Sequence, residues 1–144
     1  AIKQAQFKDE YNKAVVNLLY THSYLVGFQT SVLKPQDLSP EQYNVLRILR
    51  GQQGKPATIS AIQERMLNTM SNASRLVDKL KAKELVKRDE CPENRRKVDV
   101  LITDKGLRLL ELLEPQISAL NKKVIHLEES ELVLLNGLLD KLRG

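Results

Sequence analysis

Residues 70–84, MSNASRLVDKLKAKE, are followed by LVKRD at residues 85–89 and KVDVLI at residues 97–102. In the first segment apolar residues recur every three or four positions, which predicts an amphipathic helix over about residues 70–84. Its apolar face holds Ala73, Leu76, Val77 and Leu80. A separate polar row holds Asn72, Arg75, Lys79 and Lys83, extended near the helix start by Ser71 and Ser74. The helix therefore has one side to pack on the domain and one side rich in hydrogen-bond donors.

The segments on either side of this helix predict a winged helix-turn-helix. Upstream, Thr58 opens a short helix that runs to about Met66, and only Leu67–Thr69 separates the two helices. Downstream, residues 85–89 and the alternating residues 97–102 predict two strands. The polar turn between them carries Pro92 and arginines, so the two strands form a hairpin, or wing.

Long helices flank this unit. Apolar spacing predicts a helix over about residues 6–33, ended by Pro35. A capping box and hydrophobic staple at residues 38–43 start a helix that runs to Gly51. Thr103 caps a helix over about residues 104–127, and a last helix covers about residues 130–142.

The two C-terminal helices are apolar on more than one side. Of the 25 leucines in the chain, 13 lie between Leu107 and Leu142. A helix apolar around much of its circumference is buried on more than one side, and in a chain this short a second subunit most easily supplies the second surface. The predicted fold is mainly α with a small two- or three-stranded β wing. One domain spans residues 1–144, with long helices at 6–35 and 104–144 around a winged helix-turn-helix unit at 38–103.

Charge and composition limit the kinds of partner that the protein is expected to bind. Of the net charge of +5 over 144 residues, residues 75–97 hold nine basic and five acidic side chains, a local +4. Such a surface attracts phosphate backbones, although a solvated charged face has the same composition. All six aromatic residues precede residue 44, so stacking platforms for single strands are missing from the basic half and duplex DNA is the expected nucleic acid.

The same composition argues against several other classes of protein. No apolar run approaches the ~20 residues of a membrane helix, so no membrane partner is expected. One cysteine, Cys91, and two histidines, His22 and His126, do not make a structural zinc cluster, and we expect no metal, no cofactor and a cytoplasmic location. Neither a nucleophile elbow nor a phosphate-binding loop is present, so we predict no catalytic residues and no enzyme activity.

The chain resembles the multiple-antibiotic-resistance regulator (MarR) family of winged helix-turn-helix transcription regulators. The resemblance rests on the order of five motifs, which lie at residues 38–46, 74–80, 85–88, 92–98 and 101–106. It implies a bacterial homodimer joined through its first, fifth and sixth helices. It also implies a recognition helix from Met70 in the major groove, a wing in the adjacent minor groove, and half-sites about one helical turn apart.

The resemblance also supplies candidate DNA contacts. Thr69, Ser71, Asn72 and Arg75 match recognition-helix contact positions, and Arg96 matches the wing arginine. Two residues depart from the family pattern. Asn94 replaces the aspartate that orients this arginine, which weakens the expected hydrogen bond. Glu84 stands where the family often has glycine. The full predicted DNA-binding set is Thr69, Ser71, Asn72, Ser74, Arg75, Lys79, Asn94, Arg95, Arg96 and Lys97.

Several of these residues have a second interpretation. Arg75 contacts a guanine edge or a phosphate, or is an exposed arginine with no partner, and Asn72 either reads adenine or simply caps its helix. Ser71 and Thr69 can cap the helix, bind phosphate, or do both. Cys91 is either a redox switch or an inert surface thiol.

An effector pocket, if the protein has one, is predicted from Tyr20, Tyr24 and Phe28, although aromatic stripes at this spacing are also typical of a core. The leading hypothesis is a ligand-responsive repressor that binds double-stranded DNA as a homodimer on a pseudo-palindromic operator. The alternative is a winged-helix module that binds an acidic protein without sequence-specific DNA binding.

Overall fold

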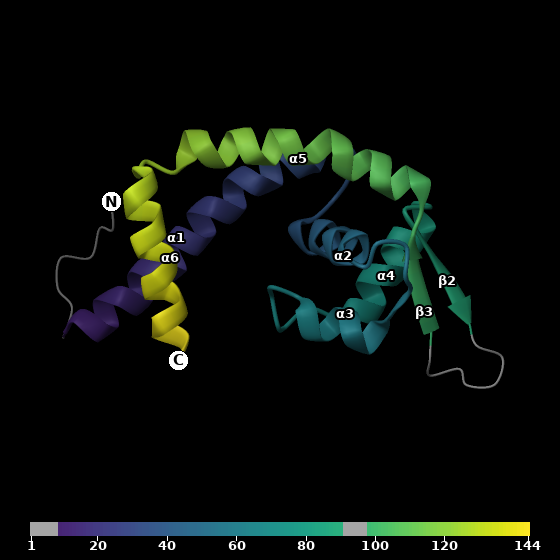
Figure 1. The fold of residues 1–144 in the computed structure, drawn as a ribbon, viewed down its shortest axis with the longest axis horizontal. Helices are drawn as coiled ribbons and strands as arrows, with labels where there is room; N and C mark the ends of the chain where they lie inside the picture. Colours follow the sequence, from purple (N-terminus) through teal and green to yellow (C-terminus); the bar gives the residue numbers. More distant parts are fainter. Residues whose placement is uncertain (1–8, 91–97) are drawn as a thin grey trace.

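The computed structural model describes residues 9–90 and 98–144, and it is mainly helical with one small sheet (Figure 1). The predicted fold class is confirmed. In chain order the elements are α1 (Glu10–Leu33), a 3-10 turn η1 (Lys34–Gln36), α2 (Pro40–Gly51), β1 (Ala57–Thr58), α3 (Ile59–Arg65), α4 (Ala73–Ala82), β2 (Val86–Glu90), β3 (Val98–Ile102), α5 (Asp104–Val124) and α6 (Glu129–Arg143).

Helices α2, α3 and α4 and the sheet form one end of the molecule, and α1, α5 and α6 extend away from it (Figure 1). The sheet is antiparallel with the order β1–β3–β2, so β3 is central. Val100 of β3 lies opposite Ala57 of β1 on one side and Arg88 of β2 on the other. The strand predicted over residues 97–102 is observed as β3, which joins the sheet together, and Lys97 lies outside the described residues.

The predicted start of α2 is confirmed in detail. The backbone N–H of Gln42 donates to Ser39 Oγ (3.1 Å), and the Ser39 N–H donates to Gln42 Oε1 (3.3 Å). Leu38 and Tyr43, the two residues of the predicted staple, are both buried. This start fixes the direction in which the chain enters the helix-turn-helix.

The recognition helix is shorter than predicted at both ends. It begins at Ala73 rather than Met70, because Asn72 has extended backbone angles and its side chain caps the helix. It ends at Ala82, and Glu84 adopts a left-handed conformation with φ 61°. The N–H of Leu85 then donates back to the Leu80 carbonyl (3.0 Å), and this closure turns the chain into β2.

Helix α1 begins at Glu10, where Asp9 caps it with an extended backbone, and the predicted start at residue 6 lies outside the described residues. Helix α5 ends at Val124, three residues before the predicted end, since Ile125 is extended. Helix α6 covers Glu129–Arg143, one residue beyond the prediction at each end. No helix in residues 9–90 and 98–144 is long and apolar enough to cross a membrane.

The hydrophobic core lies in the winged-helix part and along one face of α5. Helix α1 contributes only Leu33 as a fully buried residue, and α6 contributes none. These two helices instead expose many large apolar side chains, among them Tyr11, Val15, Leu19, Val133, Leu134, Leu138 and Leu142. One chain therefore leaves uncovered the apolar faces whose periodicity predicted burial.

Candidate DNA-binding surface

Helix α4 separates its apolar and polar residues as the sequence predicts. Ala73, Val77 and Leu80 are buried in the core, and α4 packs against α2, α3 and β2. Four of the candidate contacts on and just before the helix are exposed, namely Asn72, Ser74, Arg75 and Lys79. Thr69, in the preceding turn, is exposed as well. The structure thus brings these five side chains together at the N-terminal half and outer face of one helix.

Asn72 and Ser71 differ from the other candidates. Asn72 is the N-cap of α4, since its Oδ1 accepts from the Arg75 N–H (3.1 Å). The capping interpretation of Asn72 therefore holds, and its adenine contact stays a prediction. The Ser71 hydroxyl is buried and has no hydrogen-bond partner among the described residues.

Ion pairs and hydrogen bonds determine which charged side chains of α4 are available to a ligand. Asp78 pairs with Arg88 of β2, so the one carboxylate on the helix is compensated. Lys83, part of the predicted polar row, turns instead toward α2 and η1. Its Nζ lies 3.0 Å from Gln42 Oε1 and 3.6 Å from Asp37 Oδ2. Arg75 and Lys79 therefore remain as the cations of that row that are available to a phosphate or a base.

A cavity of about 470 Å³ lies between the start of α2 and the outer face of α4. Its lining includes Arg75, Lys79, Asn72 and Asn68, which are donors suited to a nucleic acid, and also Glu41 from α2. The local surface is therefore donor-rich but has one carboxylate at its edge, which the analysis of α4 alone did not reveal.

The turn before α4 is held by side-chain amides that the sequence analysis did not single out. Gln63 of α3 donates to the Ser71 carbonyl (2.8 Å) and accepts from the Ala73 N–H (2.9 Å). Asn44 of α2 accepts from the Leu67 N–H (2.9 Å). No sequence motif marks these amides, because each acts on backbone groups of another element. They fix the orientation of α4 relative to α2 and α3.

The wing candidates Asn94, Arg95, Arg96 and Lys97, together with Cys91, lie outside the described residues. Strands β2 and β3 pair antiparallel as far as Glu90 opposite Val98, so the predicted pairing of the two strands is confirmed.

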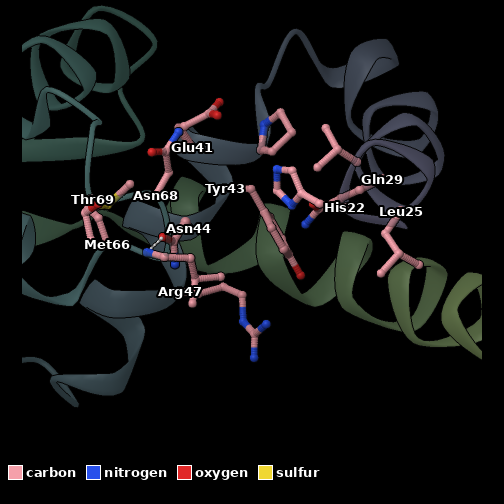
Figure 2. Close-up of a pocket in the computed structure, with 13 residues that line it drawn as sticks. His22, Leu25, Gln29, Glu41, Tyr43, Asn44, Arg47, Met66, Asn68 and Thr69 are labelled. Carbon is pink, nitrogen blue, oxygen red and sulfur yellow. Dashed lines mark hydrogen bonds between the residues drawn. The ribbon is translucent and has the colours of Figure 1, made fainter. Parts of the chain in front are cut away.

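A second cavity, of about 560 Å³, lies between α1, α2 and the turn before α4 (Figure 2). His22, Leu25 and Gln29 come from α1, Tyr43 and Arg47 from α2, and Met66 to Thr69 from the turn. The Arg47 guanidinium lies 6.0 Å from the centre of the Tyr43 ring. Burial raises the pKa of the Tyr43 phenol, an effect that Arg47 partly opposes. The ring is therefore a neutral wall of the cavity at physiological pH.

The three aromatic residues predicted for an effector pocket do not line this cavity. At 100° per residue, Tyr20, Tyr24 and Phe28 lie on the side of α1 opposite His22 and Gln29. The Tyr24 hydroxyl donates to the carbonyl of Val124 in α5 (3.1 Å), and its ring packs edge-on against Phe28 (4.9 Å between centroids). Tyr24 thus joins α1 to α5, and Phe28 packs against Tyr24 on the same face of α1.

Comparison with known proteins agrees with this geometry. The MarR family profile matches residues 38–98. The HTH-type transcriptional regulator MhqR of Bacillus subtilis is 30% identical over 105 residues, which is 72% of this chain and 71% of that protein. The crystal structure of a MarR transcription factor from Planctomyces limnophilus is 32% identical, with a TM-score of 0.71 and coverage of 94% of this chain and 98% of that one.

A third relative, BpsR of Bordetella bronchiseptica, is 25% identical with a TM-score of 0.75, over 90% of this chain and 92% of that one. Its structure is described with the regulation of its DNA binding by 6-hydroxynicotinic acid. The fold, the donor-rich face of α4 and these similarities lead to one conclusion: the chain belongs to the MarR family of DNA-binding transcription regulators, and it is not an enzyme.

Proposed function

We propose that the protein is a ligand-responsive repressor that binds a pseudo-palindromic operator as a homodimer. The observation that carries DNA recognition is the outer face of α4, where Arg75 and Lys79 are exposed and the only helix carboxylate, Asp78, is paired with Arg88. A bidentate arginine on a guanine edge discriminates by about 1–3 kcal/mol. Lysines and the wing residues Arg95 and Lys97 add phosphate attraction that salt weakens.

Dimerisation is supported by the uncovered apolar faces of α1 and α6. Contiguous exposed apolar surface on a soluble protein marks an interaction site. Residues 10–33 and 129–143 expose aromatic and leucine side chains along their length, and Figure 1 places α6 and the N-terminal part of α1 at the end of the molecule away from the sheet. A two-fold axis through that end would place two α4 helices on one side of a duplex, with half-sites about one helical turn apart.

Regulation by a small molecule is supported by the 560 Å³ cavity and its position. Its walls include Leu67, Asn68 and Thr69, the segment that leads directly into α4. Arg47 and the amides of Gln29 and Asn44 offer donors, and Leu25 and Met66 offer apolar surface. This combination fits a planar organic acid, the class to which the 6-hydroxynicotinic acid of the BpsR work belongs. Such a ligand would displace the turn and lower operator affinity, which relieves repression.

The proposal is tested by selecting bound sequences from a random duplex pool and measuring affinity for the selected duplex. We expect an inverted repeat, and an Arg75→Ala variant that loses about 10- to 100-fold in affinity. Lys55→Ala removes an exposed charge from the turn between α2 and β1, outside both cavities and the proposed dimer helices, and is the control with unchanged affinity. Equal affinity for all duplexes would contradict the proposal. So would a protein complex that unrelated DNA does not displace, the result expected of an interaction module.

A further inference from the structure

Two large apolar side chains are almost fully exposed in the described winged-helix part, residues 38–90 and 98–103. They are Leu67, 88% exposed, and Met70, 90% exposed. Leu67 lines the 560 Å³ cavity, which accounts for its position. Met70 lines neither that cavity nor the one beside α4. Neither the core nor either cavity explains why an apolar side chain is presented to solvent two residues before the N-cap of the recognition helix.

The backbone that carries Met70 is held firmly on both sides. Its own N–H donates to Asn68 Oδ1 (3.0 Å), and the next N–H, of Ser71, donates to the Asn68 carbonyl (3.1 Å). Gln63 then holds the Ser71 carbonyl (2.8 Å) and the Ala73 N–H (2.9 Å). Met70 is therefore an exposed side chain on a fixed turn. Its backbone is positioned as accurately as the start of α4 itself.

The chemistry of the major groove gives this arrangement a use. The N-terminal residues of a recognition helix are the ones that reach base edges. All the groups that distinguish bases in that groove are polar, except the C5-methyl of thymine, which apolar side chains contact. Methionine is unbranched and polarisable, so it adapts to such a small target. The neighbouring candidates, Thr69 and Asn72, are both polar and exposed.

We propose that Met70 is a specificity-determining residue that contacts the methyl group of a thymine in each half-site. The inference rests on the proposed sequence-specific DNA binding and extends it to a residue and a base. It assigns Gln63 and Asn68 as positioning residues, because their amides hold the turn that presents Met70.

The test uses the duplex selected from a random pool and replaces its thymines by uracil, one symmetric pair at a time. This change removes only the methyl group. At one thymine pair we expect the parent protein to lose about fourfold in affinity per half-site, the value of one buried methyl-sized group. Met70→Ala should bind the thymine duplex more weakly and show no further loss with uracil at that pair. Leu112→Ala, which truncates an exposed apolar side chain of α5 that lines neither cavity, is the control and should keep the sensitivity of the parent protein.

Three outcomes would overturn the inference, and they differ from one another. If a sequence is selected but Met70→Ala keeps every uracil effect of the parent, DNA specificity stands and Met70 does not read thymine. If Met70→Ala changes the dimer mass in solution, the side chain belongs to a subunit contact. If the pool yields no preferred sequence, the proposed function fails and this inference fails with it. Unfolding curves that match the parent protein confirm that the variant is folded.

Discussion

Glu84 offers a direct test of how the recognition helix ends. It follows α4 in the left-handed conformation, φ 61°, which glycine adopts without steric cost. The N–H groups of Glu84 and Leu85 donate to the carbonyls of Lys81 (2.9 Å) and Leu80 (3.0 Å), so the conformation is required by the closure of the helix. An L-residue with a Cβ in this region costs roughly 1 kcal/mol or more. We therefore expect Glu84→Gly to raise the free energy of unfolding by about 1 kcal/mol.

Little else changes with this substitution, because the other contact of Glu84 is made by its backbone. Its carbonyl accepts from Thr103 Oγ1 (2.7 Å), and glycine keeps that carbonyl. Glu84→Ala is the matched control: it removes the same carboxylate but keeps the Cβ, so its stability should stay within about 0.5 kcal/mol of the parent protein. Gln53→Gly, at φ 54° in the turn after α2, should show a gain of the same kind.

The assay is urea unfolding at a fixed protein concentration, since association shifts apparent stability. A gain of 1 kcal/mol corresponds to a rise in Tm of about 3 °C for a domain of this size. If Glu84→Gly and Glu84→Ala have equal unfolding free energies, or if the glycine variant is the less stable, the argument from backbone strain is wrong.

Three further predictions concern stability and binding. Gly106→Ala should lose about 1–3 kcal/mol of unfolding free energy, because a Cβ there would lie 2.5 Å from the Leu85 carbonyl oxygen, whereas Gly51→Ala, with open space around it, should lose nothing. A hydrogen bond from an α2 arginine lowers the pKa of the Glu114 carboxyl below its ordinary 4.5. Glu114→Gln should therefore be less stable than the parent protein at pH 7 by up to about 1 kcal/mol. Urea titrations should show this stability difference closing as the pH falls through the lowered pKa. Asn72→Ala should lose about 1 kcal/mol of unfolding free energy, because it removes the helix cap. Asn72→Asp should keep that stability but bind the selected duplex more weakly in an anisotropy titration, because its carboxylate faces phosphates. Equal binding by Asn72→Asp and the parent protein would remove Asn72 from the DNA contacts.

Local signals predicted the helix starts that depend on neighbouring residues in sequence. Ser39 with Gln42, Thr58 and Thr103 each cap the helix that they were expected to cap, because a capping bond spans three residues and needs no tertiary partner. The predicted start of α4 at Met70 is wrong. Residues 70–72 continue the helical spacing, but Asn72 caps the helix and Asn68 accepts from the Met70 N–H, so these residues lie in a turn. The Gln63 amide of α3 also accepts from the Ala73 N–H, a tertiary contact that no local pattern marks.

The 560 Å³ cavity shows why a local sequence pattern does not predict a site that is built from distant segments. The 560 Å³ cavity combines residues from three segments that are separated by up to 47 positions, from His22 to Thr69. The aromatic spacing of α1 selected Tyr20, Tyr24 and Phe28, which lie on the opposite face, because periodicity identifies a stripe but not the element that covers it. The uncovered faces of α1 and α6 have the same cause, since their periodicity predicted burial and the described part of one chain does not supply it.

The position of the α3–α4 turn bears directly on the proposed regulation. Leu67, Asn68 and Thr69 line the cavity on one side of the turn, and Asn68 lines the cavity beside α4 on the other. Asn68 also holds the backbone N–H of Met70 (3.0 Å). A ligand that moved Asn68 would therefore move the residue proposed to read thymine, without any change in the packing of α4 on the core. Because Asn68 contacts both the effector cavity and the backbone of Met70, effector binding and thymine recognition should be coupled energetically. A Met70→Ala variant should therefore lose less operator affinity when effector is added than the parent protein does.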